Sequence, residues 1–282
     1  MNQKLIAIFL AAIMLMSLLP LFMISAPEQS KTDPAITYDA PGFDSIPGAH
    51  VNHEFNSIAD GLDMTPKGVI SARYLDVSRI SGTPLEVGIN TTQLNALYNA
   101  KLTKTFFANY INESSWFELH TISPEIVAFQ YWLSPTSYNG YRMLIRETGS
   151  GTNMYNVIGT PLILGPQDMT EDVIDVLSGS SERSDEFEHI LSYADMDSEF
   201  QIIANDTSFA SQYYLDFKRL DSGEYSRTVV YLDATNSTLG NLARFETNST
   251  ERGVVYDLTT DGNITKVVVT GNFHIIANEP ME

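Results

Sequence analysis

Two histidines and a glutamate lie close together near the start of the chain, in the segment GAHVNHEFNSIADGL. His50 and His53 would share one face of a helix because they are three residues apart, and Glu54 adds a carboxylate beside them. Imidazole nitrogens and carboxylate oxygens are common zinc ligands. These three residues are therefore candidate zinc ligands, although their order differs from the HExxH pattern that places two ligands and a base together.

The same segment has a simpler interpretation. Asn52 has the side chain of a helix N-cap, and Phe55, Ile58 and Leu62 follow at the spacing of a buried helical stripe. In that arrangement Asn52 caps a short helix, and His50 lies outside it.

A second possible metal site is the acidic segment YADMDSEF. Asp195, Asp197 and Glu199 alternate as they do at the start of a calcium-binding loop. Such a loop needs a glycine at its sixth position for the sharp turn, and this chain has Phe200 there. The alternative is an exposed acidic loop without a bound ion.

Motifs for nucleophilic or phosphate chemistry are missing. The sequence contains no GxSxG elbow and no GxxxxGK[ST] phosphate loop. It has no cysteine, which excludes disulfides, thiolate metal sites and cysteine nucleophiles. The remaining histidines, His120, His189 and His274, fall on expected strands or a helix, and we interpret them as structural.

The charge of the chain limits its partners. It has 35 acidic and 16 basic residues and a formal net charge of −19. Nucleic acids and anionic lipid headgroups require a basic surface, so we expect no nucleic-acid partner.

Aromatic residues make up 11% of the chain. If Trp132 and Tyr214 lie on the outward side of their strands, they would form a binding face.

The chain carries six N-glycosylation sequons, more than its composition predicts by chance, which would suit an exported glycoprotein. Glycosylation at Asn90 would compete with the helix-capping role that its position suggests. The six acceptor residues are Asn90, Asn112, Asn205, Asn236, Asn248 and Asn263.

Residues 1–26 predict a membrane segment. Lys4 is followed by an uncharged apolar run over residues 5–26, which is long enough as a helix to cross a bilayer. We favour an uncleaved anchor over a cleaved signal peptide, because Ile24 and Pro27 suit a signal peptidase poorly. Lys4 places the remaining chain outside the cytoplasm. Residues 27–48 are rich in proline and read as a stiff tether.

The remainder of the chain contains pairs of similar sequence segments. GTPLEVG begins at Gly82, and GTPLILG begins at Gly159. SWFELHTI from Ser115 matches SEFQIIAN from Ser198, and further matches follow in the same order. We interpret these similar segments as the result of an internal duplication. The alternative is that GTPL is simply a sequence that suits the exit from a strand.

The resulting fold class is α+β, with two related units at residues 49–150 and 151–282. Each unit is expected to form an antiparallel sheet with helices on one face. Helical spacing predicts one helix through Leu94, Tyr98, Leu102 and Phe106, and a second over the segment PQDMTEDVIDVLSG. A C-terminal hairpin is expected around Asp261-Gly262.

Three functional hypotheses remain. The leading one is a membrane-anchored, extracytoplasmic binding or structural protein, without catalytic activity, that works as a subunit of a cell-surface or membrane complex. The second is a metal-dependent hydrolase that uses His50, His53 and Glu54. The third is a receptor-like domain that holds a small ligand between the two units. Zinc and calcium are the only cofactors that the residues suggest.

Overall fold

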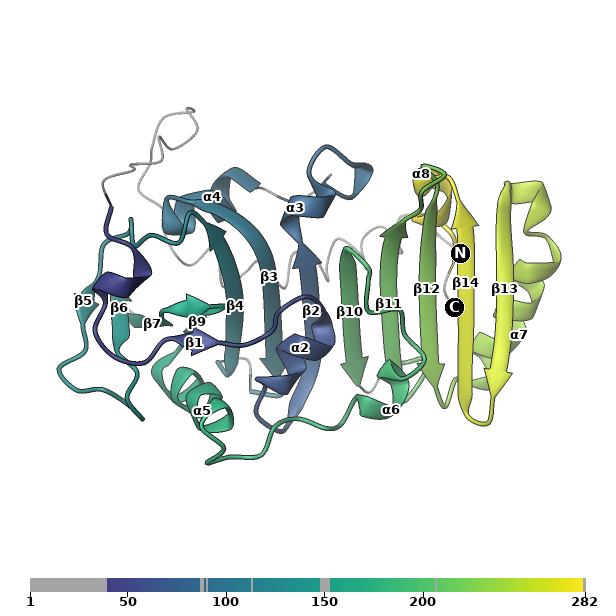
Figure 1. Ribbon diagram of the computed structural model, residues 1–282. Helices are drawn as coiled ribbons and strands as arrows, with labels where there is room; N and C mark the ends of the chain where they lie inside the picture. The colour runs from purple at the N-terminus through teal and green to yellow at the C-terminus, as the bar shows by residue number, and fades with distance from the viewer. Residues whose placement is uncertain are drawn as a thin grey trace.

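One large antiparallel sheet forms the centre of the protein (Figure 1). The computed structural model describes residues 40–86, 89, 91–112, 114–147, 153–205 and 207–280. In spatial order the strands of the sheet are β13 (Val254–Asp261), β14 (Ile264–Gly271), β12 (Tyr225–Leu232), β11 (Gln212–Arg219), β10 (Phe200–Asn205), β2 (Val69–Asp76), β3 (Lys101–Tyr110), β4 (Trp116–Ser123), β9 (Leu162–Gly165), β7 (Asn153–Val157), β6 (Met143–Glu147) and β5 (Trp132–Leu133). A separate parallel pair joins β1 (Val51–Asn52) to β8 (Gly159–Thr160). The fold class is α+β, as expected.

Helices cover both faces of this sheet, whereas the sequence predicted helices on one face only. The first face, here called the α2 face, packs against α2 (Ile58–Asp63), α5 (Gln167–Leu177) and α6 (Glu188–Leu191). The opposite face, here called the α4 face, packs against α3 (Val77–Ile80), α4 (Thr91–Tyr98), α7 (Asn236–Thr247) and α8 (Phe273–Ile276). Three short 3-10 helices, η1 (Phe43–Ser45), η2 (Pro84–Glu86) and η3 (Thr250–Arg252), complete the elements. The protein therefore has two hydrophobic cores that share the sheet between them.

The two expected units are joined within the sheet. Strand β2 pairs with β10 from Leu75 opposite Phe200 to Ser71 opposite Ala204. The boundary expected at residue 150 falls between β6 and β7, which pair directly as a hairpin. Strands β7 and β9 then lie between β6 and β4. Residues 49–150 and 151–282 therefore do not form separate sheets.

The two GTPL segments occupy different positions, which argues against the duplication. The first forms a turn that leads into η2. The second forms β8 and the start of β9. Gly159 packs so closely against the Val51 backbone that a Cβ atom would have no room there. The strands that seemed to correspond also differ, because β4 pairs with β3 and β9 whereas β10 pairs with β2 and β11.

The local predictions have mixed outcomes. The C-terminal hairpin is confirmed, with β13 and β14 joined at Gly262, whose φ is +58°. The segment after the second GTPL forms the long amphipathic helix α5. The first predicted helix is too long: α4 ends at Tyr98, and Leu102 and Phe106 belong to β3. The Thr-rich, aromatic composition of β3 favours a strand.

The predicted membrane anchor, residues 5–26, lies outside the described residues, as do residues 27–39 of the predicted tether. Residues 40–48 are described and do not form a tether, because Phe43 and Ile46 are buried in the core of the α4 face and Gly42 pairs with Ile126. Within the part of the chain that the structure describes, no helix is long and apolar enough to span a bilayer.

Asp216 is a fully buried acid in the middle of β11, on the α2 face. Its carboxylate accepts hydrogen bonds from the Tyr214 hydroxyl (3.1 Å) and the Thr228 amide (3.3 Å). Burial raises the pKa of Asp216 to about 7, and the two hydrogen bonds oppose that rise only in part. The folded protein therefore holds a proton at Asp216 at pH values where the unfolded chain has lost it.

This arrangement predicts how stability changes with pH. Because the folded pKa lies above the unfolded value, the contribution of Asp216 is fully present below about pH 4 and is lost as the pH rises through about 7. The full change is on the order of 4 kcal/mol in the free energy of unfolding. Asp216→Asn should remove this pH dependence, because an amide does not titrate in this range. Urea unfolding at a series of pH values measures it.

The matched control is Asp257→Asn, which changes an exposed carboxylate on β13. Its unfolding profile should follow that of the wild type. An Asp216→Asn profile parallel to that of the wild type would contradict the assignment of a buried, protonated acid.

Candidate functional site

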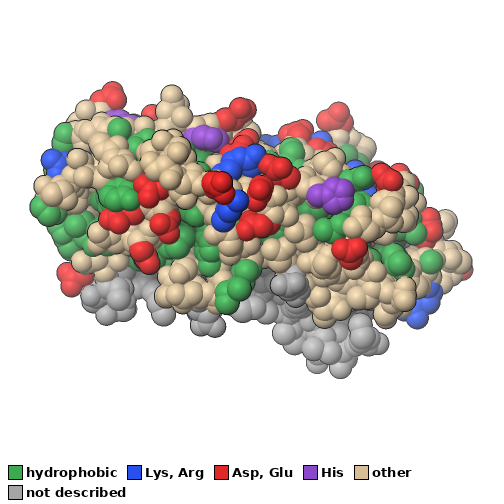
Figure 2. Space-filling model, turned by 90° about the horizontal axis from the view of Figure 1, so that it is seen from below, with side chains coloured by type: hydrophobic (Ala, Val, Ile, Leu, Met, Phe, Trp, Pro, Cys, Tyr) green, Lys and Arg blue, Asp and Glu red, His purple; other side chains and the backbone are tan. Residues whose placement is uncertain are grey.

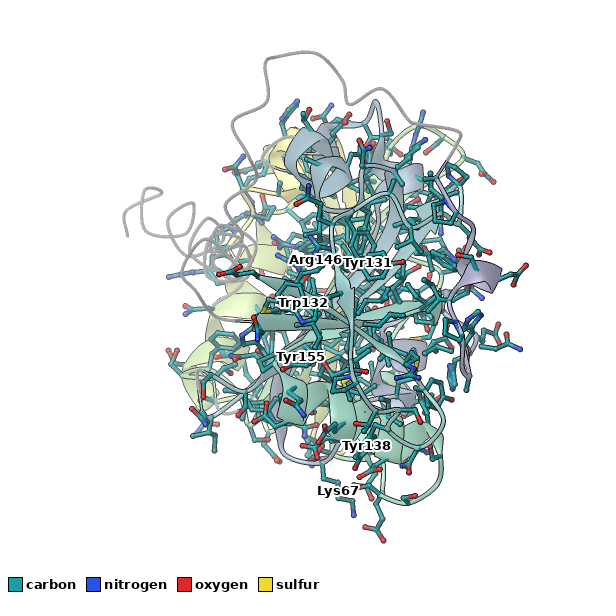
Figure 3. The ribbon with its side chains drawn as sticks, turned by 90° about the vertical axis from the view of Figure 1, so that its left-hand side faces the viewer. Lys67, Tyr131, Trp132, Tyr138, Arg146 and Tyr155 are labelled. Carbon is teal, nitrogen blue, oxygen red and sulfur yellow. The ribbon has the colours of Figure 1, made fainter. Side chains whose placement is uncertain are left out.

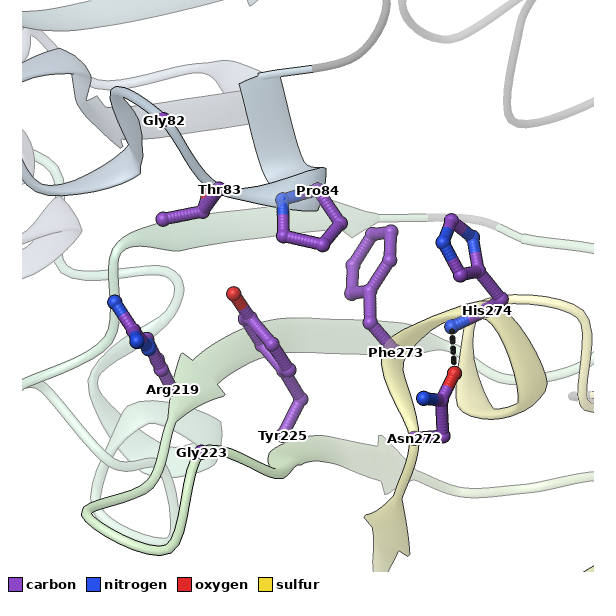
Figure 4. Close-up of a pocket in the computed structure, with 9 residues that line it drawn as sticks. All are labelled: Gly82, Thr83, Pro84, Arg219, Gly223, Tyr225, Asn272, Phe273 and His274. Atoms are coloured by element: carbon purple, nitrogen blue, oxygen red, sulfur yellow. Dashed lines mark hydrogen bonds between the residues drawn. The ribbon is translucent and has the colours of Figure 1, made fainter.

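A pocket of about 250 Å³ opens at the hairpin that joins strands β11 and β12, where segments distant in the sequence meet (Figure 4). One wall is the turn Gly82–Pro84, which follows α3. The other wall comes from the β11–β12 hairpin and from the start of α8. The volume is close to the lower end of the range for small-molecule sites.

Tyr225 forms the floor of the pocket. It is the first residue of β12, where it pairs with Arg219 on β11 and Gly271 on β14. Its side chain is only 5% exposed, yet no described residue hydrogen-bonds its hydroxyl. The hydroxyl points away from the sheet and into the pocket, toward Pro84 and Arg219 (Figure 4).

Arg219 and His274 bring basic side chains to the rim. Both residues are exposed. The backbone amide of Arg219 donates to the Glu199 carboxylate (3.0 Å), but no described residue pairs with its guanidinium. Asn272 caps α8 by accepting a hydrogen bond from the His274 amide (3.0 Å), which fixes the direction in which α8 leaves the sheet.

Phe273 supplies the apolar side of the pocket. Its ring packs against Tyr225, with 5.1 Å between ring centroids, and against Phe217 at 5.8 Å. Pro84 lies across from it, on the turn (Figure 4). The pocket therefore combines an apolar side, formed by Phe273 and Pro84, with polar groups from Arg219, Tyr225 and His274.

The acidic segment that suggested calcium instead positions this pocket. Asp197 and Glu199 each bind the Arg79 guanidinium at 2.9 Å. Lys218 contacts Asp195 at 2.9 Å and Asp197 at 3.3 Å. Because Glu199 holds both Arg79 of α3 and the backbone of Arg219, it fixes one pocket wall against the other. The three carboxylates thus neutralise basic side chains of the protein.

The residues proposed to bind zinc do not form the expected helix. His50 and His53 flank the extended strand β1, and α2 begins only at Ile58, capped by Ser57 and not by Asn52. One ring nitrogen of His50 lies 2.9 Å from the Ile46 carbonyl oxygen, and one of His53 lies 2.8 Å from that of Glu54. Among the described residues, no three His, Asp or Glu side chains gather in a way that could hold a metal ion.

The two aromatic residues proposed as a binding face have different environments. Tyr214 is fully buried on the α2 face, where its hydroxyl contacts Asp216 and the Asp195 carbonyl, so it cannot contribute to a surface. Trp132 is 46% exposed, and its neighbour Leu133 is 41% exposed. Trp132 lies on the edge strand β5 at the far end of the sheet (Figure 3), opposite Ile145, which in turn pairs with Tyr155.

Most of the sequon asparagines are accessible. Asn112, Asn236, Asn248 and Asn263 are exposed, and Asn205 is half-buried. Asn263 donates a hydrogen bond to Asp233 (3.1 Å), which a glycan would disrupt. Asn90 lies outside the described residues. Glycosylation at these positions stays a prediction.

The acidic surface expected from the composition is visible on the underside of the molecule (Figure 2). Acidic side chains are spread over this face, and basic side chains occur in small groups among them. Some basic residues form ion pairs: Lys67 lies 2.6 Å from the Glu182 carboxylate, and Arg183 lies 2.6 Å from the Glu188 carboxylate.

Sequence reasoning missed nearly all of the pocket. The first GTPL motif drew attention to Gly82–Pro84, but as part of a repeat and not as a site wall. His274 was interpreted as structural, and nothing in the spacing of Arg219, Tyr225 and Asn272 indicates that they converge. Only the pairing of β11, β12 and β14 brings these three residues together.

A second buried polar group forms a contrast to Tyr225. Tyr98 of α4 and His120 of β4 are both fully buried, and the Tyr98 hydroxyl lies 2.7 Å from His120 Nδ1. His120 Nε2 lies 2.9 Å from the Glu118 carboxylate. Both ring nitrogens of His120 therefore lie close to polar atoms of the protein and away from solvent.

Comparisons with known proteins extend to part of the chain. Residues 54–178 match a family model described as a family N-terminal domain, AF_2048_N, and the matched range ends just after α5. No curated protein sequence matches the chain. Among solved structures, crystal form I of TP0453 is similar, with a TM-score of 0.46 and 10% sequence identity over 81% of this chain and 96% of that one. At this score and identity, the likeness says nothing about function.

The different environments of the two tyrosines predict different costs for removing their hydroxyls. Tyr225→Phe should change the free energy of unfolding by less than about 0.5 kcal/mol, because the hydroxyl has no partner to lose. Tyr98→Phe should lower it by about 1–3 kcal/mol, because it leaves His120 Nδ1 buried without a partner. Urea unfolding of both variants provides the comparison. Equal losses would show that the Tyr225 hydroxyl is bonded within the protein.

Proposed function

We propose that this protein is a non-catalytic binding protein that takes a small ligand in the pocket between Gly82–Pro84 and the β11–β12 hairpin. The observation that carries the proposal is the Tyr225 hydroxyl. It belongs to a side chain that is 95% removed from solvent, it opens into the pocket, and it has no partner among the described residues. Because the hydroxyl opens into the pocket, a bound ligand can form a hydrogen bond with it there.

The position of the pocket supports the same function. The pocket lies between segments that are held by the Arg79–Glu199 ion pair and by the β2–β10 pairing, so its walls are preformed. Ligand sites in proteins are usually concave, largely preformed and partly apolar. This proposal retains the third sequence hypothesis in altered form, because the pocket lies at the end of one shared sheet.

We also propose that the folded part is displayed outside the cytoplasm by an uncleaved N-terminal anchor. The support comes from the uncharged run over residues 5–26 and from residues 27–39, which contain Pro27 and Pro34 and precede the folded part. A net charge of −19 with no cysteine suits a soluble, self-repelling domain on a cell surface.

A ligand screen tests the binding function. The full-length protein, in detergent, is heated with members of a metabolite library, and its melting temperature is recorded. A ligand present at about 100 times its Kd should stabilise the protein by about 2.7 kcal/mol and raise the melting temperature by several degrees. His274→Trp, which places a larger ring at the pocket rim, should abolish the shift.

His189→Trp is the matched control, because His189 is an exposed histidine on α6, far from the pocket. It should respond to the ligand as the wild type does. If no library member produces a shift that depends on His274, the proposed function is wrong.

A second function, as a subunit of a membrane complex, is favoured by the exposed end of the sheet. Trp132 and Leu133 are neighbouring apolar residues on β5, and half-buried Tyr131 and Tyr155 lie close by (Figure 3). Exposed apolar clusters at a sheet edge are frequent in protein interfaces.

Purification in mild detergent from the native membrane tests the subunit proposal. The wild-type chain should retain a stoichiometric partner, and the double variant Trp132→Ser, Leu133→Ser should lose it, because the apolar contact is removed. Ile111→Ser alters the most exposed large apolar residue of the described chain and is the control; it should retain the partner. Recovery of a clean wild-type monomer would contradict this role.

A further inference from the structure

The charge of the pocket differs from that of the chain around it. Acidic residues outnumber basic ones by 35 to 16 in the whole sequence, yet none of the described residues that line the pocket is an Asp or Glu. The two ionisable groups at its rim that can carry positive charge are Arg219 and His274. The nearby carboxylates of Glu199 and Glu86 are held by the backbone amides of Arg219 and Gly82, respectively. The polar groups left for a ligand therefore favour an anion.

The number of unused hydrogen-bond donors in the pocket limits how much negative charge a ligand can carry there. The backbone amides of Gly82, Thr83, Gly223 and His274 already donate within the protein. The Thr83 hydroxyl donates to the Ile80 carbonyl oxygen at 2.7 Å. The Arg219 guanidinium and the Tyr225 hydroxyl are two side-chain donors of the pocket that no described residue engages, and they can bind an anion. A single guanidinium matches the two oxygens of a carboxylate, whereas a doubly charged phosphate requires more donors.

We propose that the pocket binds a small carboxylic acid with a compact apolar group. The carboxylate pairs with the Arg219 guanidinium and accepts a hydrogen bond from the Tyr225 hydroxyl, with His274 at the rim. The apolar group packs between Phe273 and Pro84. This inference rests on the proposed binding function and specifies its ligand class.

The volume and the aromatic wall set the form of the apolar group. A pocket of about 250 Å³ admits a ligand the size of one ring with a short substituent. Phe273 is held in place by Tyr225 and Phe217, so its ring presents a fixed apolar surface. A flat or branched apolar group can contact this surface while its carboxylate reaches Arg219.

Benzoate and benzamide form a matched pair of probes, because they have nearly the same shape and differ in charge. Their binding to the full-length protein in detergent is measured by titration calorimetry and by saturation-transfer NMR. Benzoate should bind at least about tenfold more tightly than benzamide, because only the carboxylate can form the charge-assisted pair. Arg219→Ala should weaken benzoate binding by at least about tenfold, and Tyr225→Phe by about three- to tenfold.

Arg244→Ala is the control for the loss of one positive charge, since Arg244 is exposed on α7 outside the pocket. It should leave benzoate affinity unchanged. Acetate, which lacks the apolar group, should bind the wild type more weakly than benzoate does. In Phe273→Ala, which removes the apolar wall, acetate and benzoate should bind with about equal affinity.

The possible outcomes test the proposed ligand class separately from the proposed binding function of the pocket. Equal binding of benzoate and benzamide, lost in His274→Trp but kept in Arg219→Ala, would overturn the carboxylate inference and leave the binding function intact. Tighter binding of phenylphosphonate than of benzoate would overturn it in favour of a phosphate-like ligand. Benzoate binding that neither Arg219→Ala nor His274→Trp reduces, or no binding at millimolar concentration, would also overturn it.

Discussion

The pairing of β2 with β10 is the constraint on which the rest of the structure depends. These strands come from distant parts of the sequence, and their hydrogen bonds convert two sets of strands into one sheet. Asp76 ends β2, and its amide donates to the Glu199 carbonyl oxygen at 2.8 Å. The Glu199 side chain then binds Arg79. The chain that leaves β2 is thereby held above the ends of β11 and β12, where the pocket forms.

The distribution of charge follows from the same arrangement. Carboxylates near the junction form ion pairs with Arg79 and Lys218, which offset most of their negative charge beside the pocket. Arg219 lies just beyond this network, and its guanidinium is not paired with any described residue. In a chain with a net charge of −19, such an unpaired basic group beside an apolar wall is a local exception. Arg219 can therefore attract an anion at the pocket although the chain as a whole is acidic.

Several residues on the strand face that the sequence assigns to solvent are buried, because helices cover both sides of the sheet. In β11, Tyr213, Leu215 and Phe217 alternate with Tyr214 and Asp216 along the strand, and both sets lie in a core. Tyrosine tolerates either environment, since its ring is apolar and its hydroxyl needs only one partner. The sequence alone cannot show whether a second layer of helices covers the other face, because that depends on contacts between distant segments.

The sequence by itself determined the α+β class, helix α5 and the C-terminal hairpin, because these features arise from local periodicity and turn chemistry. It could not determine the order of the strands, and so it placed the boundary at residue 150 and treated the GTPL segments as equivalent. Only the tertiary structure brought Arg219, Tyr225 and Phe273 together with the turn at Gly82–Pro84. The physical reason is that pairing between strands far apart in the chain depends on the packing of both sheet faces at once, which no local pattern records.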